Sequence, residues 1–224
     1  MKIYAIHGFL GQPSDWGSPF ESLAINDFPH QNFTAWSRAL AAKAAQESEK
    51  PFLMGYSLGG RLALHALIER PDVWRGGIII SAHPGLPSRL IKKERLVVDE
   101  LWAERFEKEN WELLMQLWEN QNIFKGSPIL SRAEIDYQRP FLSACLRNFS
   151  LGKQKNLRKA IEKLPLPLLW MTGELDSQYT ELADSLAFSH PGSSKIAIKG
   201  AGHRVPWSQP LEFQATVQTF ISQN

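Results

Sequence analysis

The sequence contains a serine in surroundings that suit a nucleophile or a catalytic base. Ser57 lies in residues 55–60 (GYSLGG), which match the pattern G-x-S-x-G. An apolar run precedes it and a helical pattern follows it. At such a strand-to-helix turn the hydroxyl is exposed, and the glycines let the strand and helix backbones approach closely. The pattern therefore predicts that Ser57 is a reactive serine and not a plain turn residue.

A reactive serine needs a base, and the base needs an acid that orients it. Asp176 follows a later apolar run, and His203 lies in a glycine-rich segment after the last one. Serine, acid and histidine in this chain order can form a catalytic triad. We predict Ser57, Asp176 and His203 as that triad. Glu174 is the competing acid, but a carboxylate there is more simply a surface group, and we favour Asp176.

Negative charge that develops on a substrate oxygen is commonly stabilised by backbone N–H groups. One donor is expected from the residue after the serine, Leu58, and the other from the loop after an early strand. His7, Gly8 and Phe9 stand where the first predicted strand ends, so Phe9 is the second predicted donor. We expect His7 to bond backbone groups of that loop and to have no catalytic role.

Positioning these residues requires a sheet, and the sequence predicts one. Short apolar runs without polar alternation are typical of strands covered on both faces of a parallel sheet. Alternation of strands with helical patterns predicts an α/β fold, a mostly parallel sheet of about six strands flanked by helices. The expected strands are 2–8, 22–26, 51–57, 76–82, 166–172 and 195–199, and the expected helices are 34–47, 58–69, 180–188 and 211–221.

One long region departs from this alternation. Residues 87–163 contain no good strand pattern, only charged amphipathic helical patterns with Leu, Trp and Phe on one face. We expect an inserted helical cap there, lying over the site. Residues 1–86 and 164–224 would then form the core that carries the sheet.

The composition excludes several classes of protein. With 43% hydrophobic and 11% aromatic residues among 224, the chain can bury a sizeable core. Because 25 Lys and Arg balance 23 Asp and Glu, it lacks the broad basic field of a nucleic-acid-binding domain. Cys145 is the single cysteine, so an internal disulfide is impossible, and it is expected to be a buried apolar side chain.

No targeting or membrane segment is predicted. The apolar run at the N-terminus is broken at His7 and Gly8, which is too early for a signal peptide. No segment approaches the roughly 18 apolar residues needed to span a bilayer. We therefore expect a cytoplasmic protein without membrane insertion.

Taken in order, strand-His-Gly, G-x-S-x-G, G-E-x-D and G-x-G-H resemble the α/β-hydrolase superfamily over essentially the whole chain. Within it the sequence most resembles the 2-succinyl-6-hydroxy-2,4-cyclohexadiene-1-carboxylate synthase family of menaquinone biosynthesis. The segments that carry this second resemblance are 55–61 (GYSLGGR), 81–86 (SAHPGL), Glu94 and Arg95 with Asp99 and Trp102 beyond them, and 173–177 (GELDS).

The resemblance implies elimination of pyruvate from an enolpyruvyl-cyclohexene dicarboxylate, with the serine abstracting a ring proton instead of forming an acyl-enzyme. It implies a small polyanionic substrate. Neither it nor the residues call for a cofactor or metal, since zinc and phosphate-loop patterns are lacking. By position the resemblance assigns the triad to Ser57, Asp176 and His203, the oxyanion donors to Phe9 and Leu58, and substrate binding to Tyr56, Arg61, Arg95, Trp118 and Arg139.

The chain departs from that family pattern at two places. It starts at what would be the third strand, so we expect a fold without the leading antiparallel hairpin. The family segment D-x-P-G-H-G is also missing, because residues 26–30 run quickly into the next helix. We expect one wall of the site to be shortened as a result.

Two other functions stay open from the sequence. The same triad can hydrolyse an ester or thioester by acyl transfer. The chain can also be a binding protein of hydrolase fold without catalysis, although an intact triad argues against this. Three arginines at one pocket favour the lyase over a lipid-ester hydrolase, whose pocket would be mostly apolar.

Overall fold

The computed structural model describes residues 1–29 and 31–224, so that His30, in the shortened segment 26–30, lies outside it. All six described strands join one sheet and every pairing is parallel, in the order β2-β1-β3-β4-β5-β6. The predicted fold class is confirmed. The strands are β1 (Ile3–Ile6), β2 (Glu21–Leu23), β3 (Phe52–Tyr56), β4 (Gly76–Ile80), β5 (Leu168–Gly173) and β6 (Ser194–Ile198).

Most helices lie close to their predicted ranges. Helix α2 (Leu58–Glu69) has the predicted bounds, whereas α7 (Ser177–Asp184) begins three residues and ends four residues before its predicted bounds. Strand β2 ends early because Ile25–Asp27 form a 3₁₀ turn. The other helices are α1 (Phe33–Ala44), α3 (Arg89–Lys108), α4 (Trp111–Glu119), α5 (Arg139–Asn148), α6 (Arg158–Glu162), α8 (Val205–Ser208) and α9 (Pro210–Gln223).

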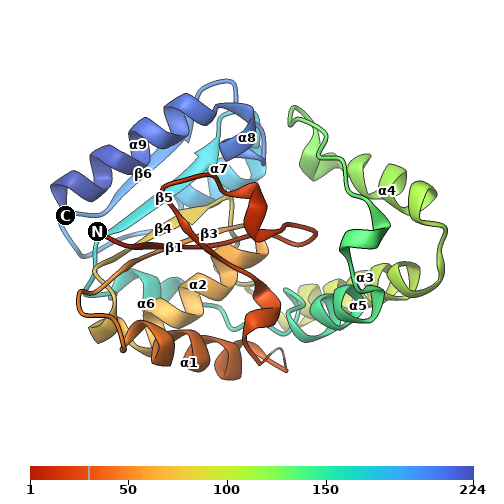
Figure 1. The fold of residues 1–224 in the computed structure, drawn as a ribbon, viewed down its shortest axis with the longest axis horizontal. Helices are drawn as coiled ribbons and strands as arrows, with labels where there is room; N and C mark the ends of the chain where they lie inside the picture. The colour runs from red at the N-terminus through yellow and green to blue at the C-terminus, as the bar shows by residue number, and fades with distance from the viewer. Residues whose placement is uncertain (30) are drawn as a thin grey trace.

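Helices cover both faces of the sheet (Figure 1). On one face Trp36 of α1 and Leu62 of α2 pack with alternate strand residues such as Leu53. On the other face Phe213 and Phe220 of α9 share a cluster with the strand residues of opposite parity. Because each strand buries both its faces, its sequence is continuously apolar, as predicted.

The helices α3, α4 and α5, residues 89–148 with their connections, form what we call the helical insertion. It has its own apolar cluster around Phe106 and Leu114, to which Leu10 from the segment after β1 contributes. Figure 1 shows it beyond the carboxyl ends of the strands, away from both termini. Ligands of open parallel sheets bind at that edge. Helix α6 instead packs against the core, with Ile161 in the cluster under α2.

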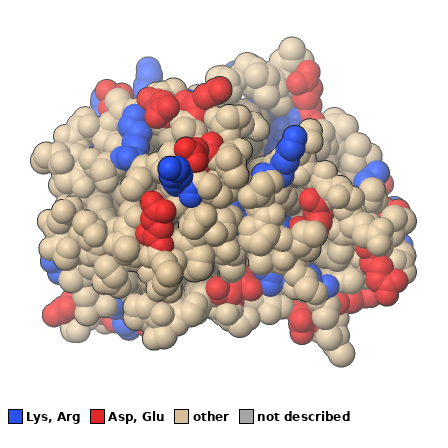
Figure 2. Space-filling view, turned by 90° about the horizontal axis from the view of Figure 1, so that it is seen from above, with Lys and Arg blue, Asp and Glu red and all other residues tan. Residues whose placement is uncertain are grey.

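The surface charge and the length of the apolar helices in the described part of the chain are the features that would mark a nucleic-acid-binding or a membrane protein. On the face seen in Figure 2, acidic and basic side chains are interspersed. No helix within residues 1–29 and 31–224 is long and apolar enough to cross a bilayer.

His65 on α2 gives a prediction on acid stability. Its ring stacks on Phe33, with ring centroids 4.4 Å apart, and its buried Nε2 atom has no partner among the described residues. Burial, and then the nearby Arg61 charge, lower the pKa of His65 to about 4 from its usual 6.5. Between these two values the unfolded chain binds a proton that the folded protein does not, so stability present above pH 6.5 is lost as the pH falls toward 4.

We expect His65→Phe, which keeps the ring stack, to remove part of that loss, on the order of 1–3 kcal/mol. Urea unfolding at several pH values between 7 and 4 measures it. In the variant the loss of unfolding free energy on acidification becomes smaller but does not vanish, because burial also lowers the pKa of His83 to about 4. An unchanged slope of the unfolding free energy against pH in the variant would show that His65 is not the group.

Candidate active site

The turn that carries Ser57 is strained and needs its glycines. Ser57 joins β3 to α2 with φ 52° and ψ −111°, a left-handed conformation that is uncommon for a residue with a side chain. A Cβ atom on Gly59 would overlap the carbonyl oxygens of Ile6 and His7, and one on Gly55 would overlap the backbone at Gly59. The glycines therefore allow α2 to lie directly on the ends of β1 and β3, with the Ser57 side chain at the tip.

The structure brings the three predicted triad residues together. His203 Nδ1 lies 2.7 Å from Asp176 Oδ2, and His203 Nε2 lies 3.2 Å from Ser57 Oγ. With Nδ1–H donating to the carboxylate, Nε2 is left to accept the serine proton. Glu174, the competing acid, is exposed and accepts instead from the Gly200 N–H at 2.9 Å. The arrangement can generate a basic serine oxygen.

Aromatic rings enclose the imidazole. His203 is 1% exposed, and the centroids of Tyr179, Tyr56 and Phe124 lie 4.7, 5.6 and 6.1 Å from its ring centroid. Burial raises the pKa of the Tyr56 hydroxyl, so Tyr56 is neutral near pH 7. It packs against the histidine and does not line the main cavity described below.

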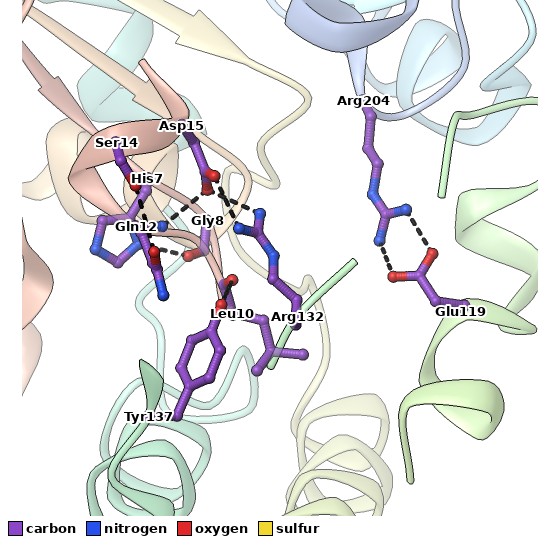
Figure 3. Close-up of polar contacts among 10 residues, drawn as sticks. All are labelled: His7, Gly8, Leu10, Gln12, Ser14, Asp15, Glu119, Arg132, Tyr137 and Arg204. Carbon is purple, nitrogen blue, oxygen red and sulfur yellow. Dashed lines mark hydrogen bonds and ion pairs between the residues drawn. The ribbon is translucent and has the colours of Figure 1, made fainter. Parts of the chain in front are cut away.

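Two residues beside Ser57 have backbone N–H groups that are not used in the described fold. The N–H groups of Phe9 and Leu58 have no hydrogen-bond partner within the described part of the chain, and both residues line the cavity. Figure 3 shows His7 beside this loop. Its Nδ1–H donates to the Gly8 carbonyl at 2.8 Å, and its Nε2 accepts from Ile25 N–H at 3.3 Å. Burial lowers the pKa of His7, so it holds the loop as a neutral side chain.

A cavity of about 630 Å³ opens between the sheet edge and the helical insertion. This volume is typical of small-molecule sites. Ser57 and His203 lie in its wall, together with apolar and charged side chains from both sides. The lining residues used below are Phe9, Leu58, Arg61, Glu94, Arg95, Asp99, Trp118 and Phe124.

Arg61 is the cavity cation that is not paired with an acid. It donates to the Phe149 carbonyl at 2.8 Å and to Gln154 Oε1 at 3.2 Å, and within residues 1–29 and 31–224 it forms no ion pair. Burial and the nearby Arg95 charge lower the pKa of Arg61 to about 10, so it is still cationic at pH 7. A half-buried cation without an acidic partner favours binding of an anion.

Arg95 reaches the same cavity in a different state. Its Nε donates to Asp99 Oδ1 at 2.8 Å, and its side chain is 43% exposed while that of Asp99 is 3% exposed. Asp99 thus balances its charge, and Glu94 adds a further acid to the wall. The cavity is less positive than three free arginines would make it.

The structure does not bring Arg139 to the site. Its guanidinium pairs with Glu134 at 2.6 Å, donates to the Glu109 carbonyl at 2.6 Å and lies 5.4 Å from the centroid of the Trp111 ring. Each of these contacts holds parts of the helical insertion together. Trp118, in contrast, does line the cavity, with its ring centroid 5.0 Å from that of Phe9.

Sequence reasoning missed two ion pairs that join the insertion to the core beside the site. Arg204 pairs with Glu119, and Arg132 pairs with Asp15 (Figure 3). Only the position of Arg204 directly after His203 was visible in the sequence. No group of three His, Cys, Asp or Glu side chains in the described ranges could hold a metal ion.

Comparisons with known proteins agree with the fold. A model of the alpha/beta hydrolase family matches residues 6–216. Proteins named 2-succinyl-6-hydroxy-2,4-cyclohexadiene-1-carboxylate synthase are similar to this chain. The one from Pectobacterium atrosepticum is 28% identical over 98% of this chain and 93% of its own, and the one from Salmonella arizonae is 32% identical over 92% and 87%. The structure of MenH from S. aureus superposes with a TM-score of 0.84 at 21% identity, covering 99% of this chain and 94% of that one.

Proposed function

Since the chain belongs to the alpha/beta hydrolase family, we propose that it is a lyase of menaquinone biosynthesis, a 2-succinyl-6-hydroxy-2,4-cyclohexadiene-1-carboxylate synthase. It would eliminate pyruvate from 2-succinyl-5-enolpyruvyl-6-hydroxy-3-cyclohexene-1-carboxylate. The observation that carries the proposal is a serine–histidine–aspartate arrangement that shares one cavity with the unpaired cation Arg61. The names of its relatives support the same activity.

In the proposed reaction Ser57 Oγ removes the ring proton next to the succinyl ketone, while His203 Nε2 takes the serine proton. The electron pair of the broken C–H bond moves through the ring double bond and expels the enolpyruvyl oxygen. This leaves a cyclohexadiene and the enolate of pyruvate, which takes the proton held by His203 and ketonises. Positioned bases of this kind contribute about 10²- to 10⁴-fold.

Charge that develops on the succinyl ketone oxygen needs donors. The N–H groups of Phe9 and Leu58, beside Ser57, are the proposed oxyanion donors. Donors held in place before the reaction stabilise such charge without reorganising. The proposed substrate also carries three carboxylates, of which Arg61 would bind one and Arg95 a second at the open side. Arg139 has no part in this proposal.

We also propose that the predicted cap, residues 87–163, acts through its helical insertion, since α6 packs against the core. The helical insertion supplies Trp118 and Phe124 to the cavity, so substrate would be enclosed between it and the sheet edge. Exclusion of water there strengthens the interaction between Arg61 and a carboxylate.

An ester or thioester hydrolase is the second candidate. The pairing of Asp99 with Arg95 favours it, since it makes the cavity less cationic than a polyanion site needs. In that case Ser57 would form an acyl-enzyme that water then cleaves.

Pyruvate release from the synthetic enolpyruvyl substrate tests the proposal, with p-nitrophenyl acetate as the comparison. We expect lyase kcat/KM to exceed ester kcat/KM by at least about 10²-fold, because only the first substrate uses Arg61. A coupled lactate dehydrogenase assay follows pyruvate. Rapid ester cleavage without pyruvate release would reject the lyase and favour the hydrolase.

A further inference from the structure

Arg204 is a buried cation and the next residue in the chain after His203, the proposed catalytic histidine. It is 4% exposed, and its Nη1 and Nη2 atoms donate to Glu119 Oε2 and Oε1 at 2.5 and 2.7 Å. Figure 3 shows this two-pronged pair bridging the core and the helical insertion. Glu119 itself follows Trp118, a cavity residue. One ion pair therefore joins the neighbour of His203 to the neighbour of Trp118.

Further contacts of Arg204 reach the same part of the insertion, and on the core side its guanidinium interacts with the Tyr56 hydroxyl. Its Nη1 also donates to the Pro128 carbonyl at 2.7 Å, and its backbone N–H donates to Ser127 Oγ at 3.2 Å. The guanidinium carbon lies 4.0 Å from the centroid of the Phe124 ring, within range of a cation–π interaction. On the side of the insertion Arg204 is thus held by residues 119–128, which we call the docking segment.

The residue on the other side of His203 touches the docking segment too. A Cβ atom on Gly202 would lie 2.5 Å from Ser127 Oγ and 2.8 Å from the Gly126 carbonyl carbon. Only glycine allows this approach without a shift. Both chain neighbours of His203, Gly202 and Arg204, contact the docking segment. A displacement of that segment would therefore move the backbone of His203 between them, and with it the imidazole.

A second ion pair provides a comparison inside the same molecule. Arg132 Nη1 and Nη2 donate to Asp15 Oδ1 and Oδ2, both at 2.8 Å, and the two side chains are 11% and 14% exposed. This pair also anchors the insertion to the core, but it does so at the 3₁₀ turn Pro13–Asp15. Along the chain neither Arg132 nor Asp15 adjoins His203 or Trp118. Both ion pairs anchor the insertion to the core, but only the Arg204–Glu119 pair includes a chain neighbour of His203.

We propose that Arg204, through its ion pair with Glu119, is a positioning residue that makes the working position of His203 depend on docking of residues 119–128. The proposal rests on the role of His203 proposed above, and extends it. Trp118, where substrate would make contact, is the chain neighbour of Glu119, and His203, which takes the proton of Ser57, is the chain neighbour of Arg204. The ion pair between Glu119 and Arg204 then links the two events. A group displaced by about 1 Å from its productive position can lose roughly 100-fold in rate.

The test measures the reactivity of Ser57 without the proposed substrate. Diisopropyl fluorophosphate phosphorylates an activated serine: Ser57 Oγ bonds to phosphorus, fluoride leaves, and the serine proton passes to His203. We expect Arg204→Met and Glu119→Gln each to slow this labelling by about 10- to 100-fold. Arg132→Met and Asp15→Asn, the matched variants, should slow it less than about 3-fold. Mass spectrometry of the intact protein follows labelling, and circular dichroism follows folding.

The double variant Arg204→Met with Glu119→Leu separates positioning from stability. Removing both buried charges avoids the cost of leaving one unpaired, so we expect its Tm to be close to that of the wild type while labelling stays slow. Labelling at the wild-type rate in this folded double variant would overturn the proposal, as would equal losses in the two single-pair series. Because labelling needs no enolpyruvyl substrate, failure of the lyase assay leaves this result interpretable.

Discussion

Ser57→Ala is expected to lower the kcat of pyruvate elimination by about 10⁴-fold, and His203→Ala by a similar factor, because serine and histidine act as one proton-transfer unit. The hydrogen bond of 3.2 Å between Ser57 Oγ and His203 Nε2 is the physical basis. Steady-state pyruvate release measures the loss. For the alternative, acyl transfer, the loss in ester cleavage would be nearer 10⁶-fold.

The control is the double variant with both alanines. If the two residues form one unit, it loses no more activity than either single variant. Asp176→Asn should be less severe for proton abstraction if Asp176 only orients His203, and its Tm reports whether the 2.7 Å contact between Asp176 and His203 also stabilises the fold. A folded Ser57→Ala protein that keeps most of its kcat would exclude a serine mechanism.

The second large effect is expected at Arg61. Arg61→Met should lower kcat/KM for pyruvate elimination by roughly 30- to 1000-fold, which corresponds to a loss of about 2–4 kcal/mol in transition-state stabilisation. The reason is that an enclosed substrate carboxylate would lose its cation. Arg61→Lys should recover only part, since lysine lacks the planar fork that binds a carboxylate through two hydrogen bonds. Hydrolysis of neutral p-nitrophenyl acetate should change far less.

Arg95 and Arg139 are the matched comparisons. Arg95→Met combined with Asp99→Asn, which leaves no unpaired carboxylate, should cost about 1 kcal/mol or less, because the Arg95 side chain is 43% exposed and its charge is already balanced by Asp99. Arg139→Met should lower Tm with little change in kcat/KM, since its partners are Glu134 and the Glu109 carbonyl. Equal losses at all three positions would contradict this reading of the cavity, and no loss at Arg61 would contradict a carboxylate substrate.

The sequence by itself determined the sheet and the order of the chemical groups. Continuous apolar runs require burial on both faces, and a parallel sheet supplies that burial. Carboxyl ends of parallel strands meet at one edge, so Ser57 after β3, Asp176 after β5 and His203 after β6 had to lie near one another. The glycines around Ser57 are equally readable, because the strained turn and the close approach to β1 are local requirements.

Only the tertiary structure decided which charges are free to act. Arg61, Arg95 and Arg139 look alike in the sequence, yet one lacks an acidic partner, one pairs with Asp99 and one braces the helical insertion. Arg204 finds Glu119 at a separation of 85 residues. Pairing between side chains depends on how helices dock across the cavity, and this docking comes from the packing of whole surfaces, which leaves no periodic trace in the chain.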